Sequence, residues 1–226
     1  MIPWEHLGTA RIPGEEGELR LMRRGSEFSI MLGANELMNS RLSGSEEALA
    51  RLALELIPDR DRPGILIGGL GMGFTLRALV EQASAKARIV VAELVPEVID
   101  WARGEMAAIF AGGLDDPRVY IRNADIADII AAADREFDAI LLDVDNGPEG
   151  LTTEANDRLY DVPGLGQARQ ALKDGGVLAI WSAHPDRGFT ARLAQAGFAV
   201  EEHKVRASRK GRGAKHVIWT AKKAER

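Results

Sequence analysis

Hydrophobic residues fall into short continuous runs along most of the chain, and helix-like stretches separate these runs. Each run is rich in Val, Ile or Leu; the runs are GILIGG (64–69), RIVVAEL (88–94), RVYIRN (118–123), DAILLDVD (138–145), GVLAIWSA (176–183), FAVEEHKV (198–205) and HVIWTAKK (216–223). Continuous apolar runs that alternate with helices are typical of a parallel sheet covered on both faces. The pattern predicts an α/β fold with a doubly wound, mostly parallel seven-stranded sheet.

Helical patterns stand between most of these runs. They cover residues 75–82, 96–110, 126–133, a stretch that includes 165–172, and 189–195. Only a loop separates the last two predicted strands, so we expect them to pair antiparallel as a C-terminal hairpin.

The amino-terminal part has a different pattern, in which apolar and polar residues alternate. Apolar residues recur at every second position of two short segments, at Leu19 and Leu21 and then at Phe28, Ile30 and Leu32. This spacing predicts a small antiparallel β extension. A helix should follow, because capping residues and acids in 43–47 precede an apolar stripe that ends at Pro58. We therefore expect two units, an extension with its helix at 1–57 and the main domain at 58–226.

Composition narrows the class of protein. The 226 residues are 46% hydrophobic and 28% charged, as in ordinary globular proteins. There is no cysteine, which excludes disulfides and thiol chemistry, and the four histidines have no paired spacing that predicts a metal site. No apolar run approaches the roughly 20 residues of a membrane span, and the amino terminus lacks a secretory pattern, so we expect a cytoplasmic location.

The net charge of −5 is unevenly distributed. Six basic residues and no acid stand within 204–215; they are Lys204, Arg206, Arg209, Lys210, Arg212 and Lys215. Such a run could bind a phosphate-bearing or nucleic-acid partner. A solvated hairpin tip is the favoured interpretation, because the run contains glycines and no aromatic residue that would stack on bases.

A glycine-rich turn follows the first predicted strand of the main domain. In the stretch ILIGGLGMGFTLRALV, Gly69, Gly71 and Gly73 are spaced as G-x-G-x-G. A dinucleotide fingerprint needs G-x-G-x-x-G and a P-loop needs Gly-Lys-Ser/Thr, so neither motif is present. In doubly wound sheets this turn usually anchors the ligand, and glycine lets the main chain approach it closely.

Acidic residues stand at the ends of the next strands, where the same ligand would lie. Glu93 ends the second strand and is placed to accept both hydroxyls of a ribose. Asp125 follows the third strand, either as a contact for an adenine amine or simply as a helix cap. The fourth strand ends in Asp143, Asp145 and Asn146, which could hold an ammonium group or accept a proton from an attacking amine, or could form a capped turn.

Taken together, these motifs resemble the class I S-adenosylmethionine-dependent fold, and more narrowly the spermidine synthase family. LIGGLGMGFTLRAL is similar to the family's glycine loop, VAELVPEVIDWAR to its ribose-binding strand and helix, and FDAILLDVDNGPEG to its catalytic strand end. The resemblance implies S-adenosylmethionine or its decarboxylated form as donor, a small-molecule acceptor, no metal and a homodimer through the amino-terminal strands. It also implies Tyr160 as a wall of the acceptor side, beside Asn146.

The chain departs from the family at three places. Met72 stands where the family has an Asp that helps to hold the aminopropyl amine, and Asn146 stands at the catalytic Asp. The family's Tyr-His-Glu signature is replaced by residues 45–48, Ser-Glu-Glu-Ala. We therefore expect methyl transfer to a small molecule, in which Asp143 contacts the donor's amino group and Asp145 orients or deprotonates the acceptor. Aminopropyl transfer and a non-catalytic nucleoside-binding scaffold are the alternatives.

Overall fold

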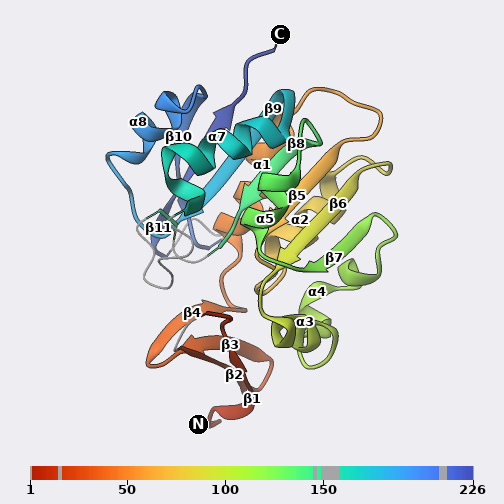
Figure 1. The fold of residues 1–226 in the computed structure, drawn as a ribbon. Helices are drawn as coiled ribbons and strands as arrows, with labels where there is room; N and C mark the ends of the chain where they lie inside the picture. Colours follow the sequence, from red (N-terminus) through yellow and green to blue (C-terminus); the bar gives the residue numbers. More distant parts are fainter. Residues whose placement is uncertain (1, 15–16, 145–146, 149–157, 209–212, 226) are drawn as a thin grey trace.

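The computed structural model describes residues 2–14, 17–144, 147–148, 158–208 and 213–225. Its larger sheet has seven strands in the order β10-β11-β9-β8-β5-β6-β7 (Figure 1). The strands are β5 (Gly64–Gly68), β6 (Arg88–Glu93), β7 (Val119–Asn123), β8 (Phe137–Leu142), β9 (Leu172–Ser182), β10 (Ala199–Arg206) and β11 (Lys215–Lys222). Strands β5 to β9 pair in parallel, whereas β11 pairs antiparallel with both β9 and β10. The predicted α/β fold and its C-terminal hairpin are confirmed.

Helices cover both faces of this sheet (Figure 1). They are α1 (Gly44–Leu56), α2 (Phe74–Gln82), α3 (Pro96–Arg103), α4 (Ala107–Phe110), α5 (Ile126–Ala132), α7 (Val162–Ala171) and α8 (Phe189–Gln195). One hydrophobic core contains residues of α1, α2, α3 and α4, and the other contains residues of α5, α7 and α8. The central strands β5 and β8 are buried along their whole length, which explains their uninterrupted apolar sequences.

One predicted helix is wrong. A single helix was expected over 96–110, but α3 ends at Arg103 and α4 begins only at Ala107. The break lies at Gly104, whose backbone (φ −102°, ψ −106°) is not helical. Glycine adopts this conformation at little steric cost, so the helix ends there although helix-forming residues continue on both sides.

The amino-terminal residues form a separate antiparallel sheet with the order β1-β2-β3-β4. Its strands are β1 (Glu5–Arg11), β2 (Glu18–Arg24), β3 (Glu27–Leu32) and β4 (Asn35–Asn39). The alternating pattern from residue 17 therefore predicted the central hairpin correctly, but β1 was not predicted. Of the seven residues of β1 only Ala10 is buried, so this strand has almost no apolar pattern to detect.

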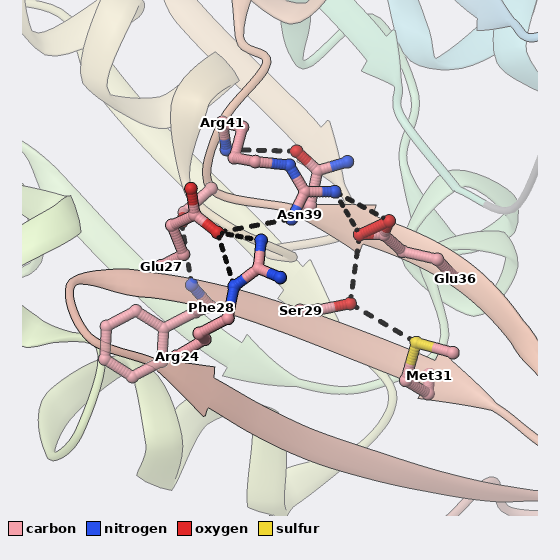
Figure 2. Close-up of polar contacts among 9 residues, drawn as sticks. Arg24, Glu27, Phe28, Ser29, Met31, Glu36, Asn39 and Arg41 are labelled. Carbon is pink, nitrogen blue, oxygen red and sulfur yellow. Dashed lines mark hydrogen bonds and ion pairs between the residues drawn. The ribbon is translucent and has the colours of Figure 1, made fainter. Parts of the chain in front are cut away.

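A polar network connects the β2–β3 hairpin to β4 and to the segment that leads into α1 (Figure 2). Glu27 pairs with Arg24 at 2.7 Å and with Arg41 at 3.8 Å. Arg41 also donates to Glu36, which in turn accepts from the hydroxyl of Ser29 at 3.1 Å. The pairs are part-exposed, so each contributes little to stability, but together they fix where the chain leaves the small sheet.

The two sheets share one hydrophobic core. Leu21 and Ile30 of the small sheet are fully buried in the same cluster as Ile67 of β5 and Leu79 of α2. Helix α1 packs on α2 and β9 and thus on the larger sheet. None of the helices in the described part of the chain combines the length and apolar character that a membrane crossing requires.

Candidate active site

The glycine-rich turn joins β5 to α2 and has a left-handed backbone at each glycine. The φ angles are +86° at Gly69, +48° at Gly71 and +75° at Gly73. A Cβ atom at Gly69 would lie 2.5 Å from the carbonyl oxygen of Asp143, and one at Gly73 would lie 2.1 Å from the Phe110 ring. Side chains are therefore excluded for two reasons, backbone conformation and lack of space.

A cavity opens beside this turn, between the carboxyl ends of the parallel strands and the small sheet. Its polar floor includes Glu93, Asp125 and Asp143 together with the main chain of Gly69 and Gly71. The small sheet and its β1–β2 connection supply an apolar roof, formed by Ile12, Leu19, Ile30, Leu37 and Met38. The structure thus brings the turn and these three carboxylates together at one edge of the sheet, as the sequence predicts.

Glu93 is held tightly at the end of β6. Its Oε2 atom accepts a hydrogen bond from the Leu70 N–H and its Oε1 atom from the Val95 N–H, both at 2.9 Å. Burial raises the pKa of Glu93, and these backbone hydrogen bonds oppose that rise. Glu93 lines the cavity, where its carboxylate is an acceptor for a sugar hydroxyl.

Asp125 caps helix α5, which is one of the two roles that the sequence predicts for it. Its Oδ1 atom accepts from the Ala127 N–H at 2.8 Å, and its Oδ2 atom accepts from Arg158 at 2.5 Å. Asp125 also lines the cavity, next to Ala124 and Ile126. The contact with an adenine amine stays a prediction.

Asp143 stands directly after β8, where the cavity meets the amino-terminal end of α2. The Thr75 hydroxyl donates to its Oδ2 atom at 2.6 Å. Burial raises the pKa of Asp143 to about 6. The other predicted residues of this strand end, Asp145 and Asn146, lie outside the described residues.

Tyr160 lies behind the cavity wall. It is buried, its hydroxyl donates to the Val144 carbonyl at 3.4 Å, and its ring meets Phe189 edge-on at 5.9 Å. Val144, not Tyr160, is among the described residues that line the cavity. Tyr160 therefore supports the wall from within the core, and its contact with an acceptor stays a prediction.

Glu46 is a site residue that the sequence did not reveal. It lines a second cavity with Met72 and Trp181, and this cavity shares Met38 and Asp143 with the first. Burial, followed by the nearby charge of Asp143, raises the pKa of Glu46 to about 7. In the sequence, Glu46 was interpreted only as an acid in the first turn of a helix. The one available signal was its position within the segment that replaces the family's Tyr-His-Glu.

The two cavities, which share part of their lining, are acidic. Their described lining includes Glu46, Glu93, Asp125 and Asp143 and contains no Lys, Arg or His. Arg158 pairs with Asp125 from outside this lining. In the part of the chain that the structure describes, no group of three or more potential ligands is arranged to hold a metal ion. The electrostatic environment therefore favours a cationic ligand.

The raised pKa of Glu46 predicts how stability depends on pH. A carboxyl group whose pKa is raised by folding stabilises the fold at low pH, and this contribution is lost as the pH rises through about 7. We expect the free energy of unfolding of the ligand-free protein to fall by on the order of 1–3 kcal/mol between about pH 5 and about pH 8. Urea denaturation at both pH values should show a smaller fall for Glu46→Gln. A Glu46→Gln curve parallel to that of the wild type would contradict this prediction.

Comparisons with known proteins agree with this geometry. A family model described as the spermine/spermidine synthase domain matches residues 43–187. A polyamine aminopropyltransferase of Mycobacterium tuberculosis is 28% identical over 197 residues, covering 83% of this chain and 36% of that protein. One from Nitrosomonas europaea is 32% identical over 124 residues, covering 55% of this chain and 36% of that protein. The chain thus spans about a third of the length of these curated relatives.

Solved structures show the same fold. The spermidine synthase of Thermotoga maritima superposes with a TM-score of 0.75 at 20% identity, over 98% of this chain and 74% of that one. A spermidine synthase in complex with the transition-state analogue AdoDATO gives a TM-score of 0.74, also at 20% identity, over 98% and 73% of the two chains. The family model alone covers more than half of the sequence, from just before α1 to just before α8. The chain therefore belongs to the spermine/spermidine synthase family.

Proposed function

We propose that this chain is an aminopropyltransferase, which moves an aminopropyl group from decarboxylated S-adenosylmethionine to a small amine. The observation that carries the proposal is the charge of the two cavities, whose described lining has four carboxylates and no basic side chain. The names of the curated relatives support the same activity.

The charge of the cavities discriminates between the two donors. S-adenosylmethionine has a carboxylate beside its amino group, and this carboxylate would be repelled by Asp143 and Glu46 if it entered the second cavity. The decarboxylated donor lacks that group and keeps both its sulfonium and its ammonium charge, which the same carboxylates attract. Methyl transfer, which the sequence favoured, requires the donor that fits this electrostatic environment less well.

The residues fit a sulfonium nucleoside in outline. Glu93 is placed for the ribose, Asp125 for the base, and the main chain at Gly69 and Gly71 for close approach of the donor. Asp143 lines both cavities and is therefore our candidate for the donor's ammonium group. The sulfonium is already activated, so the protein mainly has to position the two reactants.

Melting temperatures with added ligands test this proposal. We expect decarboxylated S-adenosylmethionine and methylthioadenosine to raise the melting temperature more than S-adenosylmethionine does. A ligand at 100 times its Kd adds about 2.7 kcal/mol, which corresponds to a shift of a few degrees. A larger shift with S-adenosylmethionine would favour methyl transfer. Binding without turnover of any amine would favour the non-catalytic scaffold.

The homodimer implied by the family resemblance and the cytoplasmic location stay predictions. Light scattering of the purified chain tests the first of them directly.

A further inference from the structure

The second cavity contains one carboxylate more than the donor's ammonium group requires. Asp143 lines both cavities and so stands at the donor's end of the second one. Glu46 comes from α1 and lines only the second cavity, whereas Glu93 and Asp125 line only the first. The remaining walls are largely apolar, with Leu37, Met72 and Trp181 among them, and suit an alkyl chain. An amine acceptor would therefore present its nitrogen between Asp143 and Glu46.

Two hydrogen bonds in series orient the Glu46 side chain. The Ser45 hydroxyl donates to the Oε2 atom of Glu46 at 2.7 Å, and the same hydroxyl oxygen lies 2.9 Å from Nδ1 of His216. When Glu46 is ionised, Ser45 uses its single proton toward the Glu46 carboxylate, and His216 then donates to Ser45 through Nδ1–H. This assigns the ring tautomer from the hydrogen-bond network.

The environment of His216 favours the neutral form of its imidazole ring. The ring is part-buried and meets Trp181 edge-on at 4.7 Å. Burial, followed by the charge of His184, lowers the pKa of His216. A neutral His216 places no positive charge beside Ser45, and Glu46 forms no ion pair with a described residue, so its carboxylate can exchange a proton with a substrate.

We propose that Glu46 is the general base of the transfer, and that Ser45 and His216 are positioning residues that hold its carboxylate toward the acceptor amine. This inference rests on the proposed aminopropyltransferase function. It gives a residue of α1 a catalytic role, in addition to the roles of the acids at the strand ends.

The proposed step is balanced in protons and electrons. The acceptor arrives as a primary ammonium group and gives one proton to the Glu46 carboxylate. The resulting neutral amine attacks the propyl carbon bound to the sulfonium, the C–N bond forms, and the C–S bond breaks with its electron pair going to sulfur. The products are a secondary ammonium group and the neutral thioether methylthioadenosine. Glu46 then returns its proton to solvent.

The groups that face Glu46 set the expected pH dependence. They are Asp143 directly after β8, Glu47 from its own helix and His216 through Ser45. Burial, and after it the charges of the two carboxylates, raise the pKa of Glu46 to about 7, so the rate should rise with pH through that value.

Steady-state kinetics of Glu46→Gln test the assignment. The donor is decarboxylated S-adenosylmethionine, and the acceptors are 1,4-diaminobutane and 1,3-diaminopropane. At about pH 7.5 we expect kcat to fall about 10²- to 10⁴-fold, the range of general base catalysis, while donor binding measured by thermal shift stays within a few fold of the wild type. The deficit should shrink toward about pH 10, because a primary alkylamine then loses its proton without a base.

Matched variants separate a base from a structural residue. Glu55→Gln makes the same change on the same helix at an exposed side chain and should leave kcat unchanged. Ser45→Ala should lower kcat less than Glu46→Gln does. The inference is overturned if Glu46→Gln keeps the wild-type kcat, or if its deficit is the same at every pH. Absence of wild-type turnover with both diamines would instead overturn the proposed function, and the base role with it.

Discussion

Replacing Gly69 with alanine is expected to abolish donor binding and to lower the free energy of unfolding by about 3 kcal/mol or more. The left-handed backbone at φ +86° disfavours a side chain, and the new Cβ atom would lie 2.5 Å from the Asp143 carbonyl oxygen. This oxygen belongs to the main chain at the end of β8 and cannot move without shifting Asp143. The glycine turn and the acidic strand end would therefore be displaced together.

Gly112→Ala is the matched control for this prediction. Gly112 has almost the same backbone angle, φ +81°, but a Cβ atom there would meet nothing within 4 Å. The variant should lose only the roughly 1–2 kcal/mol of left-handed strain and keep its donor affinity. Urea denaturation and ligand-induced melting shifts measure both effects. Equal losses in the two variants would show that the close contact at Gly69 is unimportant.

Asp138→Ala should lower the free energy of unfolding by about 3–5 kcal/mol without weakening donor binding. The Asp138 carboxylate is fully buried and accepts from the Gly64 N–H at 2.7 Å. It also pairs with Lys173 and Arg60, each at 2.7 Å. The substitution leaves two cations and a backbone N–H without their shared partner. Asp138 lies at the start of β8, whereas the cavities lie beyond its other end, so the site itself should be unaffected.

The control is Asp61→Ala, which removes an exposed ion pair with Lys86. It should change stability by less than about 1 kcal/mol, as is usual for surface pairs. Urea denaturation gives both values, and melting shifts with methylthioadenosine show whether the site is intact. A loss at Asp138 no greater than that at Asp61 would contradict a structural role for the buried carboxylate.

The large sheet was predictable because its central strands are apolar on both faces. The runs at β5 and β8 are buried throughout, and such runs in alternation with helices are typical of this class of fold. Strand β1 is exposed over most of its length and has no such pattern, and the break at Gly104 interrupts a sequence that otherwise favours a helix.

The site was predictable only where it follows from the geometry of the strands. Glu93 ends β6 and Asp143 follows β8, and these two strands flank β5 in parallel. Strand direction alone therefore brings both residues to the glycine turn that follows β5. Glu46 reaches the same place through the packing of α1 on α2 and β9, which no local pattern specifies. Tyr160 was assigned by resemblance, and the burial of its ring is a property of this chain's own core.

Strand β4 supplies Leu37 and Met38 to both cavities, whereas the carboxylates come from elsewhere in the chain. The β3–β4 pairing already shifts register between Ile30 and Met31, so this hairpin tolerates irregularity. Changes of side-chain size along β4 can therefore reshape both cavities while the carboxylates that line them stay in place. Under the proposed function, the choice of acceptor can diverge in evolution through a few codons of this one short hairpin, without any change in the carboxylates.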